Sequence, residues 1–291
     1  MITVFTPAYN RAYILSKLYN SLKSQTCKDF EWLIIDDGST DNTKKLVETF
    51  MSEQQITLRY YYQENGGKHR AINKGVKLAK GEWFFIVDSD DYLPNDSIDT
   101  IKKYTSQISK DHSFAGVSGL RCYPSGKTIG GEFKYTILDT DAVTVREKYK
   151  VKGDLAEVWR TSVLEEYPFP EFENEKFMSE GTVWMQIAKK YRLRYFNKGV
   201  YICEYLTDGL TRNIRKCRRN SPQGSMYNLT MVMRDERFSV ITKIRAAVNY
   251  WRYTKGIIPC CKENIPPYWA YLFILPGTII RHIDIYLENH K

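Results

Sequence analysis

The strongest constraint on the fold is an alternation of apolar runs with amphipathic segments over the first hundred residues. Four apolar runs predict strands, at residues 2–5, 30–35, 57–62 and 83–87. The segments between them carry apolar residues at helical spacing, at 14–22, 41–51 and 68–80. Strands that are apolar on both faces lie in sheets covered by helices, and repeated strand–helix units favour parallel pairing. The sequence therefore predicts an α/β fold.

Beyond Pro94 the pattern changes to mixed strands and helices. Further extended segments are predicted at 114–123, 133–138 and 193–205, and a helix at 183–191. Helical patterns dominate from about Arg212, with one apolar face formed by Val240, Ile244, Ala247, Val248 and Trp251. We therefore expect a domain over 1–211, with halves at 1–100 and 101–211, and a helical extension over 212–291.

Net charge separates the same two parts of the chain. The formal charge is +9, from 43 Lys and Arg against 34 Asp and Glu. Residues 1–211 hold 29 basic and 29 acidic side chains, whereas residues 212–291 hold 14 and 5. A basic balance often indicates nucleic acid or an anionic membrane as partner. Because no nucleic-acid recognition motif is present, we expect no nucleic-acid partner.

The cysteines and the apolar segments predict a compartment. The six cysteines lack paired or metal-ligand spacing, which is typical of a reduced, cytoplasmic protein. The chain opens into a strand-like run without a basic and apolar leader, so we expect no signal peptide. The longest apolar stretch, 268–280, is shorter than the roughly 20 residues that span a membrane, which argues against an integral membrane protein.

The strand at 83–87 ends in an acidic cluster that suggests a metal site. Asp88 and Asp90 are two positions apart, so on extended chain both carboxylates face the same way. Two such oxygen donors suit Mg²⁺ or Mn²⁺ with substrate phosphates as the other ligands. The alternative is a solvated acidic turn, in which Asp is common.

Three other polar clusters follow predicted strands. Asp37 could accept a hydrogen bond from a uracil imide or a ribose hydroxyl, or could cap the next helix in an Asx turn. Lys68 opens a helix after two glycines, where phosphate is favoured, although a plain glycine-rich loop explains the glycines equally well. After the first strand Pro7 fixes a turn, Tyr9 could stack on a base, and Arg11 could approach phosphate. Ligands of such sheets bind beyond the carboxyl ends of the strands.

Taken in order, these clusters resemble one family. The segments TPAYNR, LIIDDGSTDNT, ENGGKHRAINKG and FFIVDSDDYLP are similar, in order and spacing, to motifs of the family 2 glycosyltransferases. The resemblance covers about the first 100 residues. It implies a GT-A fold, a Rossmann-like mixed sheet flanked by helices, and an inverting enzyme that uses a nucleotide-sugar, with a UDP-sugar as the expected donor. It also implies that Mn²⁺ or Mg²⁺ is held on the donor diphosphate by the DXD motif.

The resemblance carries roles to individual residues. It implies that 1–100 binds the nucleotide-sugar and that 101–211 binds the acceptor. Asp90 would bind the metal and Asp88 would lie on the ribose side. The other donor-binding positions are Pro7, Ala8, Tyr9 and Arg11 around the nucleotide, Asp37 on uracil, Lys68 near the pyrophosphate and Asn73 in the helix that follows.

The family also has an acidic general base at the start of a helix in the acceptor half. The segment FMSEGTVW resembles that element and makes Glu180 the base, although Gly181 stands where the commoner motif has Asp. The alternative is a first-turn acid stabilised by the helix dipole. Trp184 is assigned weakly to an acceptor sugar, and a core aromatic is the alternative.

The C-terminal part predicts a membrane-facing surface. A cationic run comprises Arg212, Arg215, Lys216, Arg218 and Arg219, and further basic residues are Lys243, Arg245, Arg252 and Lys255. The stretch 268–275 is rich in Trp, Tyr and aliphatic residues. Cationic and aromatic residues beside an apolar face are typical of interfacial helices. The extension therefore predicts peripheral attachment to the cytoplasmic face of an anionic membrane, with a packing extension or a homodimer as alternatives.

The expected function is transfer of a sugar, hexosyl or N-acetylhexosaminyl in type, to a hydroxyl of a glycan acceptor. A lipid-linked acceptor in surface polysaccharide synthesis suits the predicted membrane surface. Two alternatives stay open. A metal-dependent nucleotidyltransferase would have a Gly-rich basic loop after the first strand, which TPAYNR is not. A non-catalytic nucleotide-sugar-binding relative is opposed by the presence of Asp88, Asp90 and Glu180.

Overall fold

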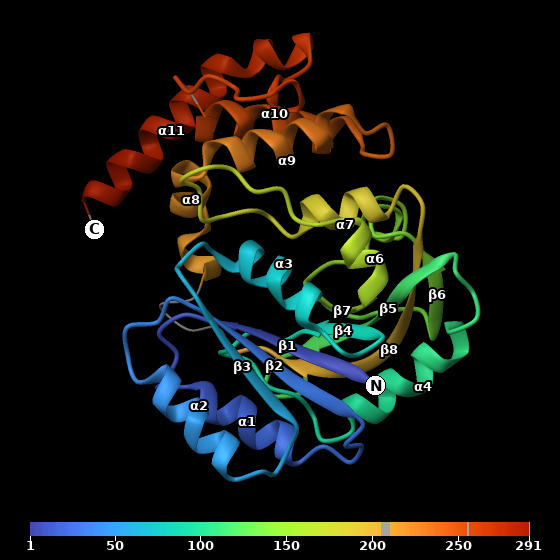
Figure 1. Ribbon diagram of the computed structural model, residues 1–291. Coiled ribbons are helices and arrows are strands. Elements are labelled where there is room, and N and C mark those ends of the chain that lie inside the picture. The colour runs from blue at the N-terminus through green and yellow to red at the C-terminus, as the bar shows by residue number, and fades with distance from the viewer. Residues whose placement is uncertain (205–209, 255, 291) are drawn as a thin grey trace. The chain divides into compact units, whose positions relative to one another are not determined.

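The computed structural model describes residues 1–204, 210–254 and 256–290, and the side chains of 210–212 and 289 lie outside that description (Figure 1). Two predicted basic residues are affected, because the side chain of Arg212 and all of Lys255 fall outside the described part. The chain forms two compact units. The first comprises Met1–Pro168 and Met185–Leu206, and the second comprises Phe169–Trp184 and Thr207–Lys291.

The first unit is built on an eight-stranded sheet with the order β3-β2-β1-β4-β7-β5-β8-β6. Its strands are β1 (Ile2–Ala8), β2 (Phe30–Asp37), β3 (Leu58–Gln63), β4 (Trp83–Ile86), β5 (Phe114–Cys122), β6 (Ile137–Thr140), β7 (Leu155–Arg160) and β8 (Arg192–Ile202). Strands β1 to β4 pair in parallel, as does β5 with β8. Strand β7 is antiparallel to both neighbours, and β6 is antiparallel to β8. The mixed α/β sheet predicted from the sequence is thus confirmed.

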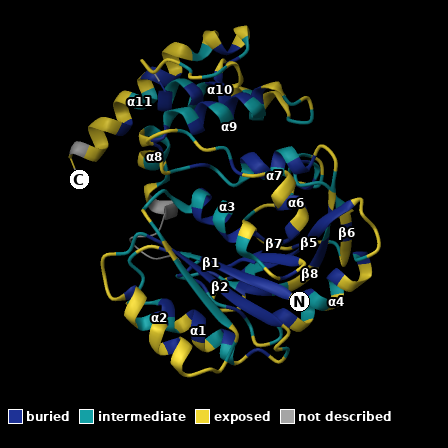
Figure 2. Cartoon of the chain, viewed as in Figure 1, coloured by how far each residue is buried: buried dark blue, intermediate teal, exposed yellow. Residues whose placement is uncertain are grey.

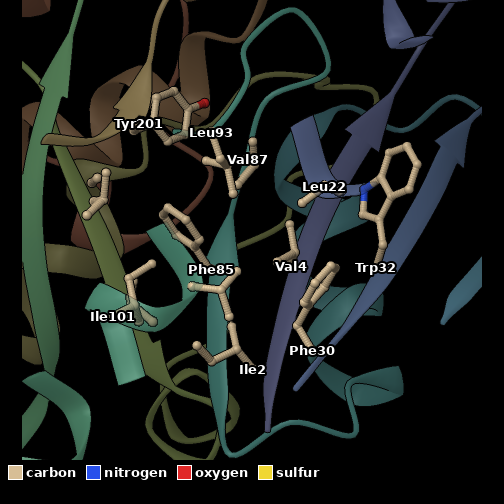
Figure 3. Packing of buried hydrophobic residues seen from close by; sticks show 14 of the residues in the cluster. Ile2, Val4, Leu22, Phe30, Trp32, Phe85, Val87, Leu93, Ile101 and Tyr201 are labelled. Carbon is tan, nitrogen blue, oxygen red and sulfur yellow. The ribbon is translucent and has the colours of Figure 1, made fainter. Parts of the chain in front are cut away.

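Helices cover both faces of this sheet (Figure 1). They are α1 (Leu15–Lys23), α2 (Thr43–Ser52), α3 (Lys68–Leu78), α4 (Ser97–Ile108), α5 (Thr144–Glu147) and α6 (Thr161–Glu166). Apolar residues of α1, α2 and α4 join one buried cluster with alternate strand residues, among them Val4, Trp32 and Phe85 (Figure 3). Phe5 points to the opposite face, where its ring stacks on Phe84 with centroids 4.9 Å apart. Apolar residues on both strand faces therefore hold helices on both sides.

Glycine allows α3 to approach the sheet closely. A Cβ added at Gly75 would lie 2.2 Å from the ring of Phe5, so a larger residue there would push the helix away. Helix α3 begins at Lys68, directly after Gly67 with a φ of +95°. The packing of α3 thus fixes where its first residue stands relative to the ends of β1 and β2.

The structure corrects several predicted boundaries between residues 68 and 202. Helix α3 ends at Leu78, before the predicted 80, and β6 occupies 137–140 where the sequence predicted a strand over 133–138. Strand β8 spans 192–202, and helix α7 (Gly181–Ile187) starts earlier and ends earlier than predicted. Strand β7 was not predicted, because its six residues include Glu157 and Arg160 and lack a clear apolar run. Arg160 is nonetheless buried, and it donates to the carbonyls of Phe114 and Ile108.

The second unit is helical. It contains α8 (Leu210–Asn220), α9 (Pro222–Arg234), α10 (Val240–Thr254), η1 (Lys262–Asn264), η2 (Tyr268–Phe273) and α11 (Ile274–Asn289). The sequence assigned the segment 169–184 to the 101–211 half, and the structure groups it with these helices. Glu175 of that segment accepts hydrogen bonds from the backbone of Gln223 (2.6 Å) and Gly224 (2.8 Å), which caps the start of α9.

A buried carboxylate fixes α11 on α10. Asp284 is 4% exposed and accepts two hydrogen bonds from Arg252, at 2.6 and 2.8 Å. Arg215 and Arg219 also lie within ion-pair distance of it, at 3.4 and 3.8 Å. Close packing adds to this contact, because a Cβ at Gly277 would come within 2.6 Å of α10 backbone. Two arginines of the basic extension, Arg219 and Arg252, are therefore largely buried around Asp284, and the exposed Arg215 reaches it from outside.

The opposite side of η2 and α11 is apolar and exposed (Figure 2). We call it the α11 stripe, and its residues are Tyr268 (94% exposed), Leu272 (79%), Leu275 (69%), Ile279, Ile283 and Tyr286. Among the described residues one helix, Tyr268–Glu288, is long and apolar enough to cross a membrane by length and composition, and 22% of its 18-residue apolar window is buried. The prediction that no apolar segment reaches that length is wrong, because the helix continues beyond residue 280.

Candidate active site

The loops that follow β1 and β2 are joined by hydrogen bonds. The backbone of Asn10, with a φ of +53°, donates to Ser39 Oγ at 2.8 Å, and its side-chain oxygen accepts from the backbone of Thr40 at 2.8 Å. The backbone of Arg11 donates to Thr43 Oγ1 at 3.0 Å. Asn tolerates the left-handed conformation better than most residues. These bonds hold the TPAYNR segment against the DDGST segment.

Asp37 ties the end of β2 to the glycine loop before α3. Its carboxylate accepts from the backbone of Gly66 (2.8 Å) and Gly67 (2.7 Å) and from the side chain of Gln63 (2.7 Å). Asn65 donates to the carbonyl of Asp37 at 2.8 Å. Asp37 is 4% exposed, so most of its hydrogen-bonding capacity serves this loop. Its predicted contact with uracil stays a prediction.

Lys68 and the end of β4 come together at the same edge of the sheet. Lys68 Nζ lies 2.5 Å from Asp88 Oδ1, in a half-buried ion pair. Burial opposes ionisation of Asp88, but the charges of Lys68 and Arg121 outweigh that cost and hold the pKa of the carboxyl below its ordinary value. Arg11 also acts on this carboxylate through its charge. The basic and acidic residues predicted for the donor site thus share one region.

The pKa values of the neighbouring acids Asp90 and Asp91 are shifted in the opposite direction. Burial, followed by the negative charge of Asp88, raises the pKa of Asp90 above its ordinary value. Burial, with the charge of Asp88 second, raises the pKa of Asp91 to about 7. The surroundings of the turn therefore stabilise the ionised form of Asp88 but disfavour the ionised forms of Asp90 and Asp91. A cation at this turn would relieve their repulsion.

These carboxylates fit a cation that is shared with a ligand. In the described part of the chain no group of three or more His, Cys, Asp or Glu side chains is placed to hold a metal ion. Mg²⁺, and Mn²⁺ with similar ligands, accepts one or two carboxylates and completes its shell with phosphate oxygens and water. Asp88 and Asp90 fit that arrangement, because they supply two carboxylates beside Lys68. They do not make a cage for an ion bound by protein alone.

Tyr201 of β8 and Asp91 of the turn itself were not predicted as site residues, and together they hold this turn. Tyr201 OH accepts from the backbone of Asp88 at 2.9 Å and donates to Asp91 Oδ2 at 2.7 Å. Both side chains are buried. Asp91 was visible as the last acid of the DSDD segment, whereas nothing in the local sequence distinguishes Tyr201 from other tyrosines.

The remaining predicted donor residues differ in exposure. Tyr9 is 49% exposed, and Pro7 and Asn73 are half-buried, Asn73 within α3. The side chain of Ala8 is buried in the cluster under α1, so only its backbone could face a nucleotide. Their roles toward a ligand stay predictions.

Glu180 and Trp184 belong to the second unit. The carbonyl of Glu180 accepts from the backbone of Val183 and Trp184, at 3.0 and 3.2 Å, so this residue starts the first turn of α7 as predicted. The Trp184 ring meets the Phe169 ring edge-on, with centroids 5.9 Å apart. The catalytic role of Glu180 and the sugar contact of Trp184 stay predictions.

Comparisons with known proteins identify the region that carries the four motifs. The family model described as glycosyl transferase family 2 matches residues 3–122. This range contains β1 except for its first residue, β2 to β4, the turn after β4 and all donor residues predicted above.

Two relatives extend the comparison. The uncharacterized glycosyltransferase MG060 of Mycoplasma genitalium is 39% identical over 115 residues, which is 38% of this chain and 39% of that protein. The GalNAc(5)-diNAcBac-PP-undecaprenol beta-1,3-glucosyltransferase of Campylobacter jejuni is 27% identical over 195 residues, which is 65% of this chain and 60% of that protein. The chain thus spans about two fifths of the length of the first relative and 60% of the second.

Solved structures show the fold over a longer range. S. aureus TarS 1–349 in complex with UDP has a TM-score of 0.62 at 18% identity, with 100% of this chain and 92% of that chain covered. The mannosyltransferase PcManGT of Pyrobaculum calidifontis, in complex with GDP-Man and Mn²⁺, has a TM-score of 0.56 at 17% identity, with 97% and 87% covered. This likeness concerns the fold, and it confirms the predicted GT-A architecture with C-terminal helices. Residues 3–122 thus match the model of glycosyl transferase family 2, the family that the four sequence motifs resemble.

Proposed function

We propose that this protein is an inverting glycosyltransferase that moves a sugar from a UDP-sugar to a hydroxyl of a glycan acceptor. The observation that carries the proposal is the meeting of Lys68 with Asp88 beside Asp90, at the edge where four family motifs end. TarS has been solved with UDP and with UDP-GlcNAc, and these names support uridine as the base.

Each motif contributes to donor binding in this proposal. Tyr9 stacks on the base and Asp37 accepts from its imide, with Pro7 and Ala8 shaping the loop around them. Lys68 and Arg11 attract the diphosphate, and the ion pair of Lys68 with Asp88 opens to receive it. Asp88 then accepts from the ribose, and Asn73 supports the loop from α3. Cationic side chains near the ends of β1 and β3 suit a dianionic ligand.

Asp90 would hold Mn²⁺ or Mg²⁺ together with the diphosphate. When bound there, the ion neutralises negative charge that grows on the departing nucleoside diphosphate. The Mn²⁺ in the PcManGT complex supports a divalent ion, although it does not select between the two metals. The raised pKa of Asp90 agrees with a carboxylate whose charge has no full counterpart in the protein.

Glu180 serves as the general base. Its carboxylate takes the proton from the acceptor hydroxyl while the hydroxyl oxygen attacks the anomeric carbon from the face opposite the leaving group. A single displacement of this kind inverts the configuration at that carbon. Trp184 contributes an aromatic surface on which an acceptor sugar stacks.

A lipid-linked glycan is the acceptor class that best suits the second unit. The Campylobacter relative is named for an undecaprenol-linked substrate, and another relative is named chondroitin synthase, which supports a role in surface polysaccharide synthesis. The α11 stripe leaves large apolar side chains facing outward. Peripheral binding to the cytoplasmic face of an anionic membrane would cover them. Ion pairing of Arg215, Arg219 and Arg252 with Asp284 reduces the charge available for this binding, so the apolar stripe is its main contact.

Release of UDP tests the activity. We expect UDP-sugars with Mn²⁺ to release UDP in the presence of a glycan acceptor, and a panel of nucleotide-sugars screened by thermal shift would identify the donor. Binding of UDP-sugar without release or transfer to any acceptor of a glycan panel would indicate a non-catalytic binder instead.

Flotation tests the membrane contact. Leu272→Glu with Leu275→Glu in the full chain should abolish flotation with phosphatidylglycerol vesicles, because it places two charges in the α11 stripe. Met51→Glu, at an exposed apolar residue of α2, is the matched control and should float normally. Equal flotation of both variants would contradict membrane binding through the stripe, and a loss of dimer in sedimentation would assign the stripe to a homodimer.

A further inference from the structure

The turn that carries Asp88 and Asp90 is joined to a strand that is distant in the sheet. Strands β7 and β5 lie between β4 and β8. Tyr92 and Ile202 nevertheless form an antiparallel bridge, with N–O distances of 3.1 and 2.8 Å. The carboxyl end of β8 therefore reaches the turn after β4 directly. This contact is independent of the hydrogen bonds within β4 itself.

Tyr201 extends the bridge into the turn. Its hydroxyl accepts from the Asp88 backbone at 2.9 Å and donates to Asp91 Oδ2 at 2.7 Å, and its side chain is 0% exposed. The ring is fixed on two sides, because Phe85 meets it edge-on at 6.1 Å and the Arg121 guanidinium lies 4.2 Å from its centre. One hydroxyl thus connects the first and the last acid of DSDD (Figure 3 shows Tyr201 beside Phe85 and Val87).

Asp91 links the turn after β4 to the residues that follow β8. Its Oδ1 accepts from the backbone of Glu204 at 2.9 Å, and its backbone donates to the carbonyl of Asp88 at 3.2 Å. The Glu204 carboxylate in turn pairs with Lys17 of α1. These contacts use the backbone of Asp88 and the side chain of Asp91. They do not use the carboxylate of Asp88 or of Asp90.

We propose that Tyr201 and Asp91 are positioning residues that preset the turn after β4, so that the carboxylates of Asp88 and Asp90 are oriented before the diphosphate and its cation bind. This inference rests on the proposed function, because the donor is the ligand whose binding it explains. A site that is oriented in advance does not spend binding energy on ordering. Removing the hydroxyl would leave a buried N–H and a buried carboxylate oxygen without their partner.

The test measures UDP binding by titration calorimetry with Mn²⁺, and donor kinetics in parallel. Tyr201→Phe keeps the ring and its packing but removes the hydroxyl. We expect the Kd for UDP with Mn²⁺ and the KM for the donor both to rise about tenfold, with a smaller change in kcat. Tyr195→Phe is the matched control, because Tyr195 is 1% exposed on the same strand and away from the turn. Its Kd for UDP should stay within about twofold of wild type.

Asp91→Asn is the second variant, and it keeps an oxygen that can accept from Glu204. It should weaken UDP binding in the same direction even if Tyr201→Phe fails to fold. Binding by the folded variants within about twofold of wild type, or an equal loss in Tyr195→Phe, would overturn the inference. A wild-type protein that binds no UDP with either Mn²⁺ or Mg²⁺ would defeat the proposed function and this inference together.

Discussion

Each unit buries a carboxylate with arginine, but the two carboxylates are stabilised differently. In the first unit Glu31 is 1% exposed and accepts from Thr3 Oγ1 (2.7 Å), the Lys80 backbone (2.7 Å) and Arg59 (2.9 Å). In the second unit the described hydrogen bonds to Asp284 come from the side chains of Arg252 and Arg215. The sheet unit adds two neutral donors to its arginine, a hydroxyl of β1 and a backbone N–H, whereas the described donors to Asp284 are all arginines. Three of the 14 basic residues of 212–291 are therefore gathered around one buried acid.

The largest expected effect is on the chemistry of the first unit. Asp90→Ala should lower Mn²⁺-dependent UDP release by at least ~1,000-fold, because it removes the carboxylate proposed to hold the metal. Asp99→Ala removes an exposed carboxylate of α4 and should leave turnover unchanged. Turnover retained by Asp90→Ala over a Mn²⁺ titration would show that this unit does not carry the metal-dependent step.

The next effect is on the free energy of unfolding, which should differ between variants of the two buried carboxylates. Asp284→Asn should lower the free energy of unfolding by about 3 kcal/mol, since clustered arginines lose their counter-charge. Glu31→Gln should cost less, about 1 to 2 kcal/mol, because its oxygen still accepts from Thr3 and the backbone. Urea unfolding measures both, with Glu236→Gln on the surface as control. Equal losses at Glu31 and Asp284 would remove the distinction between the two units.

The next effect concerns the proposed general base, which lies in the second unit. Glu180→Gln should lower sugar transfer by at least ~100-fold while the Kd for UDP stays near wild type, because an amide cannot take the acceptor proton. Glu173→Gln, at an exposed position in the same segment, should transfer normally. Unchanged transfer in Glu180→Gln would place the base on another residue.

Acid should weaken the Asp284 contact in a defined pH window. Burial opposes ionisation of Asp284, but the hydrogen bond and charge of Arg252, with Arg215 and Arg219, lower its pKa on folding. A lowered native pKa adds stability that is fully present above the unfolded pKa of about 3.9 and is lost as the pH falls toward the native value. The stability difference between wild type and Asp284→Asn should therefore be constant from about pH 5 to 8 and shrink below about pH 4. A difference that grows in acid would contradict this sign.

The smallest effect tests the exposed stripe. Leu272→Ala should change the free energy of unfolding by less than about 0.5 kcal/mol, because its side chain is 79% exposed. Leu22→Ala in α1, at 0% exposure, should cost about 3 kcal/mol. A large loss at Leu272 in urea unfolding would mean that the stripe is covered within the protein in solution.

Local patterns predicted the part of the fold whose signals are local. The first four strands and three helices follow apolar periodicity, and the positions of Lys68, Asp88 and Asp90 at one edge follow from strand ends in a parallel sheet. The DSDD turn was visible for the same reason. The resemblance to the family supplied the ligands expected at this edge, a nucleotide-sugar and a divalent metal ion.

The rest depends on contacts between distant residues. The bond of Tyr201 to Asp91 joins positions 110 residues apart, and that of Arg252 to Asp284 joins positions 32 apart. Neither pair has a local sequence signal, and β7 was missed because it lacks a clear apolar run and its Arg160 is buried although charged. Charge counting likewise could not show that Arg215, Arg219 and Arg252 surround a buried acid.

The antiparallel position of β7 also affects how the protein is made. Strand β4 pairs with β1 on one side and with β7 on the other. The second pairing brings Arg160 opposite Trp83, so it can form only after β7 has been synthesised. Closing such a long loop is slow, and an unpaired edge strand is open to pairing with other chains. When the ribosome has synthesised all four family motifs, the edge of β4 that later pairs with β7 is therefore still unpaired. Completion of the nucleotide-binding half depends on a later strand that carries none of its predicted donor or metal residues.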